Sequence, residues 1–251
     1  MSDQVLLVAD RVWDGVGDRP VPRFRVLVRD GRVAEVGEHV TAPAGTEVVE
    51  LSGHTLLPGF IDCHVHVVDE SLNTAPVAEQ ALRAIPPLRT LLANGFTTVR
   101  DLGGSDQPIN TALRDAIADE GFWAGKPAAV REKLHEHADH ARATAALVAG
   151  SDVVLAFGTD AGLFPYEENW KEFPTMVRLG VEPVRALRAA TSVAADLLDR
   201  PDLGRVEPGA TADLVAVPGD PFEDIEVTGQ VGFVMQAGAV VQHREGGVSR
   251  L

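Results

Sequence analysis

Strand-rich segments at both ends of the sequence enclose a middle of alternating strands and helices, and this pattern restricts the fold most strongly. Short apolar runs separated by turn pairs such as Asp30-Gly31 fill residues 4–57, and similar runs return over residues 204–243. Such spacing is typical of short strands joined by tight turns. We expect strands at 5–9, 25–28, 33–36, 47–51, 55–57, 204–206, 213–217, 232–236 and 240–243. The two ends together predict one composite β-sandwich domain, made of residues 1–57 and 203–251.

The middle, residues 58–202, changes to the alternation that is typical of parallel βα units, so the predicted fold class is α/β. Asn94-Gly95 ends one predicted helix, and Pro127 stands where a helix favours proline, at its first position. We expect strands at 60–67, 96–99 and 153–157, and helices at 76–94, 110–119, 127–149 and 183–198.

Two histidines lie in the first of these apolar strands. Side chains alternate along a strand, so His64 and His66 leave the same face and Cys63 and Val65 leave the other. Neutral imidazole is the commonest ligand for zinc-like ions, and this pair would supply half of a metal site. An isolated His-x-His also fits two half-buried histidines at a strand end. The Pro58-Gly59 entry and the rest of the chain favour the metal-ligand interpretation.

Other polar residues follow the remaining strands of the middle, where α/β folds place their ligands. Arg100 and Asp101 follow one strand, and either orient a substrate or form an ion pair at the strand end. Asp160 follows the 153–157 strand and precedes Ala161-Gly162. Its carboxylate either projects into a crevice or caps the next turn, which is common for aspartate before glycine.

Composition excludes several classes of partner and site. The formal net charge is −15, which argues against nucleic acid or anionic membrane as a partner, because phosphate binding needs clustered Lys and Arg. The single cysteine, Cys63, excludes an internal disulfide framework and a cysteine-cluster metal site. No apolar run approaches the ~18 residues of a membrane span, and residues 1–16 lack the layout of a signal peptide. We therefore expect a cytoplasmic protein.

Six stretches follow one another in the order of a known motif set. They are 57–66 (LPGFIDCHVH), 95–101 (GFTTVRD), 156–162 (AFGTDAG), 186–191 (ALRAAT), 204–215 (GRVEPGATADLV) and 219–221 (GDP). Together they resemble the metal-dependent amidohydrolase superfamily, in particular its imidazolonepropionase-like and Xaa-Pro dipeptidase-like branch. The resemblance covers nearly the whole chain.

This resemblance implies a TIM-barrel-like domain that hydrolyses amide, peptide-like or cyclic amide bonds with metal-activated water. By the same resemblance, His64 and His66 bind a divalent metal, most often zinc, and Asp160 is both a metal ligand and the general base. Beyond what the resemblance implies, we expect Arg100 and Asp101 to orient the substrate or the ligands. Tyr166 and Asn169 are expected near the substrate as well, at a loop that departs from the relatives, because Tyr166 and Glu167 stand where those have histidine and glycine before this asparagine. The partner is then a small-molecule or peptide-like substrate.

The chain departs from this family in the length of its barrel. A complete (β/α)₈ barrel takes about 250 residues, and residues 58–202 offer far fewer. The family also uses a carbamoylated lysine and two histidines from the central strands, which have no clear counterpart here. We infer an internal deletion near Gly125/Lys126, which leaves an incomplete barrel with at most one metal ion.

Other lysine and histidine side chains fit solvated positions better than the missing ligand positions. Lys126 stands one residue before a helix start. His135, His137 and His140 lie on an acid-rich helix, and His140 is roughly 20 Å along it from Pro127, away from the catalytic end.

Three functional interpretations remain open. The first is a metal-dependent hydrolase, the second a catalytically impaired truncated relative, and the third an abridged gene model of a full-length enzyme. Three strands of eight cannot close a barrel, so the exposed sheet edges predict self-association or a homo-oligomer.

Overall fold

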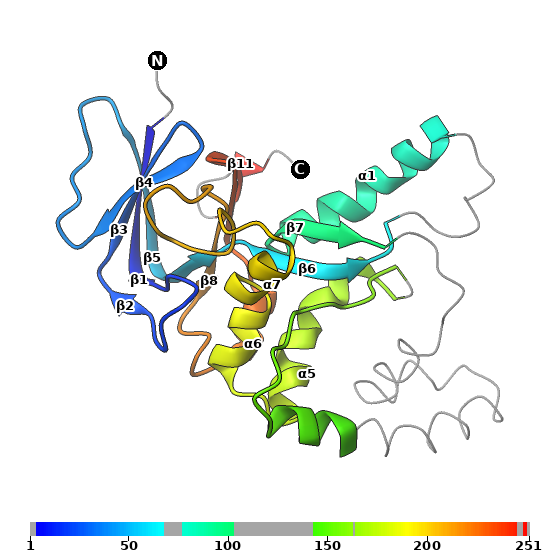
Figure 1. The fold of residues 1–251 in the computed structure, drawn as a ribbon. Coiled ribbons are helices and arrows are strands. Elements are labelled where there is room, and N and C mark those ends of the chain that lie inside the picture. Colours follow the sequence, from blue (N-terminus) through cyan, green and yellow to red (C-terminus); the bar gives the residue numbers. More distant parts are fainter. Residues whose placement is uncertain (1–3, 68–76, 103–142, 163, 245–247, 250–251) are drawn as a thin grey trace.

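The computed structural model describes residues 4–67, 77–102, 143–162, 164–244 and 248–249 (Figure 1). The strands are β1 (Gln4–Val12), β2 (Val21–Pro22), β3 (Arg25–Arg29), β4 (Arg32–Gly37), β5 (Glu47–Pro58), β6 (Phe60–Val65), β7 (Phe96–Asp101), β8 (Leu214–Pro218), β9 (Phe233–Gln236), β10 (Ala239–His243) and β11 (Val248–Ser249). The α-helices are α1 (Val77–Ala93), α5 (Glu172–Arg178), α6 (Pro183–Ala189) and α7 (Ser192–Leu197), and the 3₁₀ helices are η2 (Tyr166–Lys171) and η3 (Ile225–Gly229). Residues 143–149 are also helical. No helix among the described residues combines the length and the apolar character that crossing a membrane requires.

Strands from both ends of the chain share one nine-stranded mixed sheet with the order β11-β10-β9-β8-β5-β1-β3-β4, and β2 pairs with β1. The two ends join where β5 pairs antiparallel with β8, and β5 pairs parallel with β1 on its other side. The sheet is curved, so that the turn between β3 and β4 and the turn between β9 and β10 both contact Ala212. The amide of Ala212 donates to Gly31 O at 2.9 Å, and the amide of Gly238 donates to Ala212 O at 3.0 Å. The predicted composite of both ends is therefore one continuous curved sheet rather than two separate ones. The division into domains at residues 57 and 203 stays a prediction.

The second sheet contains the parallel pair β6 and β7. The prediction of a strand at 153–157 is wrong. Val153 and Val154 are exposed, and pairing with β6 starts only at Phe157. From there residues 157–161 follow the free edge of β6, where the Cys63 amide donates to Phe157 O and the His66 amide to Ala161 O. The order is thus β7, β6, then 157–161. No further strand extends this sheet within the described ranges, so the part described is not a closed barrel.

The helix predicted at 183–198 is interrupted between α6 and α7. Its break has a physical cause: Ala190 O accepts a 2.7 Å hydrogen bond from the Ile61 amide, and Ala189 O accepts a 2.8 Å bond from the Phe157 amide. Two carbonyls at the end of α6 are thereby directed to the β6 sheet, and Thr191 adopts φ −134° and ψ −102°. The strand predicted at 204–206 is also absent. The helix at 110–119 and most of the one at 127–149 lie outside the described residues.

Four phenylalanine side chains pack together and connect β6 with the neighbouring elements. Phe60, Phe96, Phe157 and Phe173 come from β6, β7, the 157–161 segment and α5, and each is buried. The Phe157 and Phe173 ring centroids lie 4.5 Å apart, and those of Phe60 and Phe173 lie 4.9 Å apart. In Figure 1, α1 lies on one side of β6 and β7 while α5, α6 and α7 lie on the other. This packing fixes β6, which carries His64 near its end and is followed directly by His66.

Candidate metal centre

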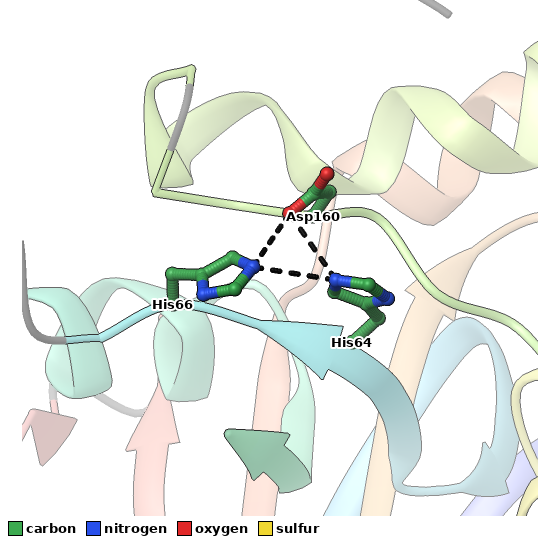
Figure 2. A group of neighbouring side chains, drawn as sticks. All are labelled: His64, His66 and Asp160. Carbon is green, nitrogen blue, oxygen red and sulfur yellow. Dashed lines mark hydrogen bonds and ion pairs between the residues drawn. The ribbon is translucent and has the colours of Figure 1, made fainter. Parts of the chain in front are cut away.

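His64 at the end of β6 and His66 just after that strand point to the same side, as the strand period predicts (Figure 2). Nε2 of His64 and Nε2 of His66 lie 3.3 Å apart, while the intervening Val65 is fully buried on the opposite side. The His64 side chain is 39% exposed and the His66 side chain 11% exposed. His64 is therefore partly open to solvent, whereas His66 is largely covered.

Asp160 meets this pair from the neighbouring segment. Its Oδ1 lies 2.8 Å from His66 Nε2 and 3.3 Å from His64 Nε2, and Figure 2 shows the carboxylate above the two rings. One ligand atom from each of the three residues lies within 4.8 Å of the others. Two imidazole nitrogens and one carboxylate oxygen are the donor set of many hydrolytic zinc sites, which use three protein ligands and leave a position open. This donor set fits a divalent metal.

Two glycines allow Asp160 to come so close to β6. A Cβ atom on Gly162 would lie 2.3 Å from His66 O, and one on Gly158 would lie 3.0 Å from His64 Cβ. Asp160 itself has φ +62°, in the left-handed region that non-glycine residues seldom occupy. The segment therefore makes a tight turn directly against the strand, and this turn aims the carboxylate at the imidazoles.

A second carboxylate lies beneath the three donors. Asp62 is fully buried, and its Oδ1 accepts 3.1 Å hydrogen bonds from the amides of His64 and Thr159. Its Oδ2 accepts a 2.5 Å bond from the Thr159 hydroxyl. Burial raises the pKa of Asp62 to about 6, although the hydrogen bonds from Thr159 and His64 lower it. Sequence reasoning missed both residues, and the available signal was an aspartate inside the apolar run 60–67.

The four residues predicted around the metal ligands or the substrate do not form one group. They are Arg100, Asp101, Tyr166 and Asn169. Arg100 Nε donates to Cys63 O at 2.6 Å, and the Tyr166 hydroxyl donates to His66 O at 2.6 Å, so both support the β6 backbone. Asn169 is 1% exposed and accepts a hydrogen bond from Asn94. Asp101 lies at the exposed end of β7. A role of these residues in substrate binding stays a prediction, and Lys126, His135, His137 and His140 lie outside the described residues.

Comparison with known proteins decides the family. The model of the amidohydrolase family matches residues 55–149 and 128–241, two overlapping stretches that include all three donors. The chain belongs to the amidohydrolase family. The resemblance inferred from the motifs is thereby confirmed.

Among curated relatives of this chain, a dihydroorotase from Pelobacter propionicus is 35% identical over 101 residues, which are 40% of this chain and 22% of the relative. An allantoinase from Streptomyces avermitilis is 33% identical over 138 residues, which are 50% of this chain and 29% of the relative. The matching stretches thus span less than a third of these relatives.

Solved structures resemble this chain over nearly its whole length. A prolidase in complex with N-methylphosphonate-L-proline has a TM-score of 0.79 and 20% identity, with 96% of this chain and 100% of that chain covered. A Xaa-Pro dipeptidase with bound methionine has a TM-score of 0.76 and 20% identity, with 95% and 100% covered. At this identity the likeness shows a shared fold, and the expected α/β class is confirmed at that level.

Proposed function

We propose that this amidohydrolase is a metal-dependent hydrolase of carbon–nitrogen bonds, acting on an amide, peptide-like or cyclic amide substrate. One divalent ion, zinc in the first instance, would be held by His64, His66 and Asp160. The observation that supports the proposal is the convergence of these three donors within 4.8 Å, from segments that are distant in sequence. Family membership supplies the reaction class.

Each donor has a distinct part in the proposed chemistry. A bound divalent ion lowers the pKa of water to about 7 and polarises a carbonyl. His64 and His66 would hold that ion with Nε2, from a strand whose backbone is fixed on both edges. Asp160, with its side chain 15% exposed, would take the proton from water and pass it to the leaving nitrogen. The 39% exposed His64 would lie on the side open to substrate.

The substrate is proposed only as a class. The sequence relatives are a dihydroorotase and an allantoinase, whereas the structural neighbours include a prolidase and a Xaa-Pro dipeptidase. These names agree on no single compound. Each aligned sequence relative also shares less than a third of its length with this chain.

A second candidate is a catalytically impaired truncated relative, or the product of an abridged gene model. It is favoured by one observation: the described barrel-like sheet consists of β7, β6 and the 157–161 segment. Sequencing the genomic region around codons 122–130 would detect a missing coding segment or a frameshift.

Metal analysis tests the hydrolase directly. We expect the purified protein to hold close to one equivalent of Zn, Mn, Fe or Co, and the His64→Ala variant to lose most of it. His39→Ala is the matched control, because His39 is exposed and distant from the site in sequence. Hydrolysis of a panel of acylated amino acids, Xaa-Pro dipeptides and cyclic amides would then be measured with and without chelator. Wild type without stoichiometric metal, and indistinguishable from His64→Ala, would refute the proposal.

A further inference from the structure

We infer that Asp62 and Thr159 act as positioning residues that hold Asp160 against His64 and His66, and thereby set the affinity of the site for a metal ion. The inference rests on the proposed function insofar as it concerns metal affinity. Its geometric part concerns only the chain itself. We refer to these two residues as the Asp62–Thr159 pair.

The pair joins the two segments that supply the donors. Asp62 Oδ1 accepts hydrogen bonds from two backbone amides. One is the amide of His64, a candidate metal ligand, and the other is the amide of Thr159, which directly precedes the candidate ligand Asp160. Through this oxygen atom, Asp62 is bonded to Thr159, which lies 97 residues later in the sequence. This oxygen atom therefore adds a side-chain link between the histidine strand and the aspartate turn, besides the backbone hydrogen bonds that the amides of His66 and Asp160 donate across the same gap.

The Thr159 hydroxyl secures both sides of Asp160. It donates to Asp62 Oδ2 at 2.5 Å and accepts from the Ala161 amide at 3.2 Å. Residues on either side of Asp160 are therefore tied to one hydroxyl group. A left-handed backbone is unfavourable at a non-glycine residue and persists where the surroundings determine it. The Thr159 hydroxyl helps to hold this backbone conformation, because it closes the turn in which Asp160 has φ +62°.

A purely stabilising role explains the pair poorly. Asp62 and Thr159 are both fully buried, and a buried carboxylate usually costs stability relative to a well-packed apolar residue. Asp62 is also not among the residues whose ligand atoms cluster at this site, and both its oxygens accept hydrogen bonds from neighbouring groups. Groups that orient metal ligands are known to change metal affinity by about 10–100-fold when they are removed.

The test compares two substitutions of Thr159. Thr159→Val removes the hydroxyl at nearly constant volume, and Thr159→Ser retains it. Thr228→Val is the matched control, because Thr228 is equally buried and its hydroxyl donates to Ile225 O at 2.7 Å, in η3. For each protein we would measure the Zn²⁺ dissociation constant by chelator competition, the absorption spectrum of the Co²⁺ form, and the free energy of unfolding without metal. Hydrogen exchange of the Asp160 amide, which donates to His64 O at 2.7 Å, would be followed in metal-free protein.

We expect Thr159→Val to weaken Zn²⁺ binding about 10–100-fold, to alter the Co²⁺ spectrum and to speed exchange at Asp160. Thr159→Ser should stay within about threefold of wild type, and Thr228→Val should lose stability without change in affinity or spectrum. If Thr159→Val loses stability while affinity, spectrum and exchange match wild type, the pair is merely structural and the inference is overturned.

Two further outcomes are decided by the same set of proteins. If Thr159→Val does not fold, Thr159→Ala replaces it, and failure of both to fold would overturn positioning in favour of a folding role. If wild type binds no metal, the proposed function fails, whereas the exchange measurement still decides whether the pair holds Asp160.

Discussion

The Thr159 hydroxyl lies 2.5 Å from Oδ2 of Asp62 and joins β6 to a turn 97 residues later in the sequence. This contact is internal to the site: neither residue is among the three donors, yet each is close in sequence to one of them. The three candidate metal ligands therefore do not lie on independent loops. They lie on a strand and a turn that share a buried hydrogen-bond network, which is the arrangement that a precise ligand set requires.

The close approach of the turn to β6 predicts a severe effect of Gly162→Ala. The new Cβ would lie 2.3 Å from His66 O, at a position with φ +122°, so the turn must move away from the strand. We expect a loss of about 2–3 kcal/mol in the free energy of unfolding and weaker metal binding. Gly209→Ala is the control, because Gly209 also has positive φ but nothing lies within 4 Å of a Cβ there. Denaturant unfolding of both variants measures the difference, and equal losses would contradict the steric explanation.

Part of this site could be predicted from the sequence. The spacing of His64 and His66 fixes their common face, because the strand period is a local property. Asp160 was identified by the resemblance of its motif, since spacing alone also fits a turn-capping aspartate. Asp62 and Thr159 could not be paired, because their contact depends on which segment follows the edge of β6.

The fold was predictable to a similar extent. Strand and helix positions such as α1 and β7 followed from periodicity and turn signals, and both were found within about a residue or two of expectation. The break after α6 was not predictable, because it arises from the Ile61 amide bonding to Ala190 O, a contact between segments far apart in sequence. The curvature of the large sheet was likewise not predictable, because it brings Ala212 against Gly31 and Gly238, which are far from it in sequence.

The aromatic cluster beneath β6 predicts a large cost for Phe173→Ala. Phe173 is fully buried and contacts the rings of Phe60, Phe96 and Phe157. Truncating a buried phenylalanine costs about 3–5 kcal/mol, and Phe173→Leu should cost clearly less because it fills more of the cavity. Phe24→Ala is the control at a half-buried position. Chemical denaturation measures all three, and a cost for Phe173→Ala no larger than that for Phe24→Ala would show that the cluster does not hold these elements together.

Stability should depend on the charge of Asp202 in a defined pH range. Arg200 donates to both carboxylate oxygens at 2.8 and 2.9 Å, and Thr211 donates at 3.0 Å, which holds the pKa of Asp202 well below its ordinary value of about 4. A lowered pKa in the folded state contributes stability above the unfolded pKa, and that contribution is lost as pH falls through the folded pKa.

Asp202→Asn should therefore be less stable than wild type at pH 7, and the difference should shrink below about pH 4. The effect should be small because the Asp202 side chain is 31% exposed and the pair is partly screened by solvent. Urea unfolding at pH 7, 5 and 3.5 tests this, with Asp18→Asn as a control whose carboxylate is 89% exposed. A difference that grows toward low pH would have the wrong sign.

The edge of β7 predicts self-association. Within the described residues β7 pairs only with β6, and the adjoining helix α1 exposes Leu82, Ile85 and Leu88 by 67%, 41% and 41%. A strand edge without a neighbouring strand, next to exposed apolar side chains, favours contact with a second copy. Because the net charge of −15 opposes association, we expect oligomers to increase with ionic strength. Sedimentation velocity at low and high salt measures this. Leu82→Glu should shift the population toward monomer, whereas Leu197→Glu, at a 54% exposed position on α7, should not. A single monomeric species for wild type at both salt concentrations would contradict the prediction.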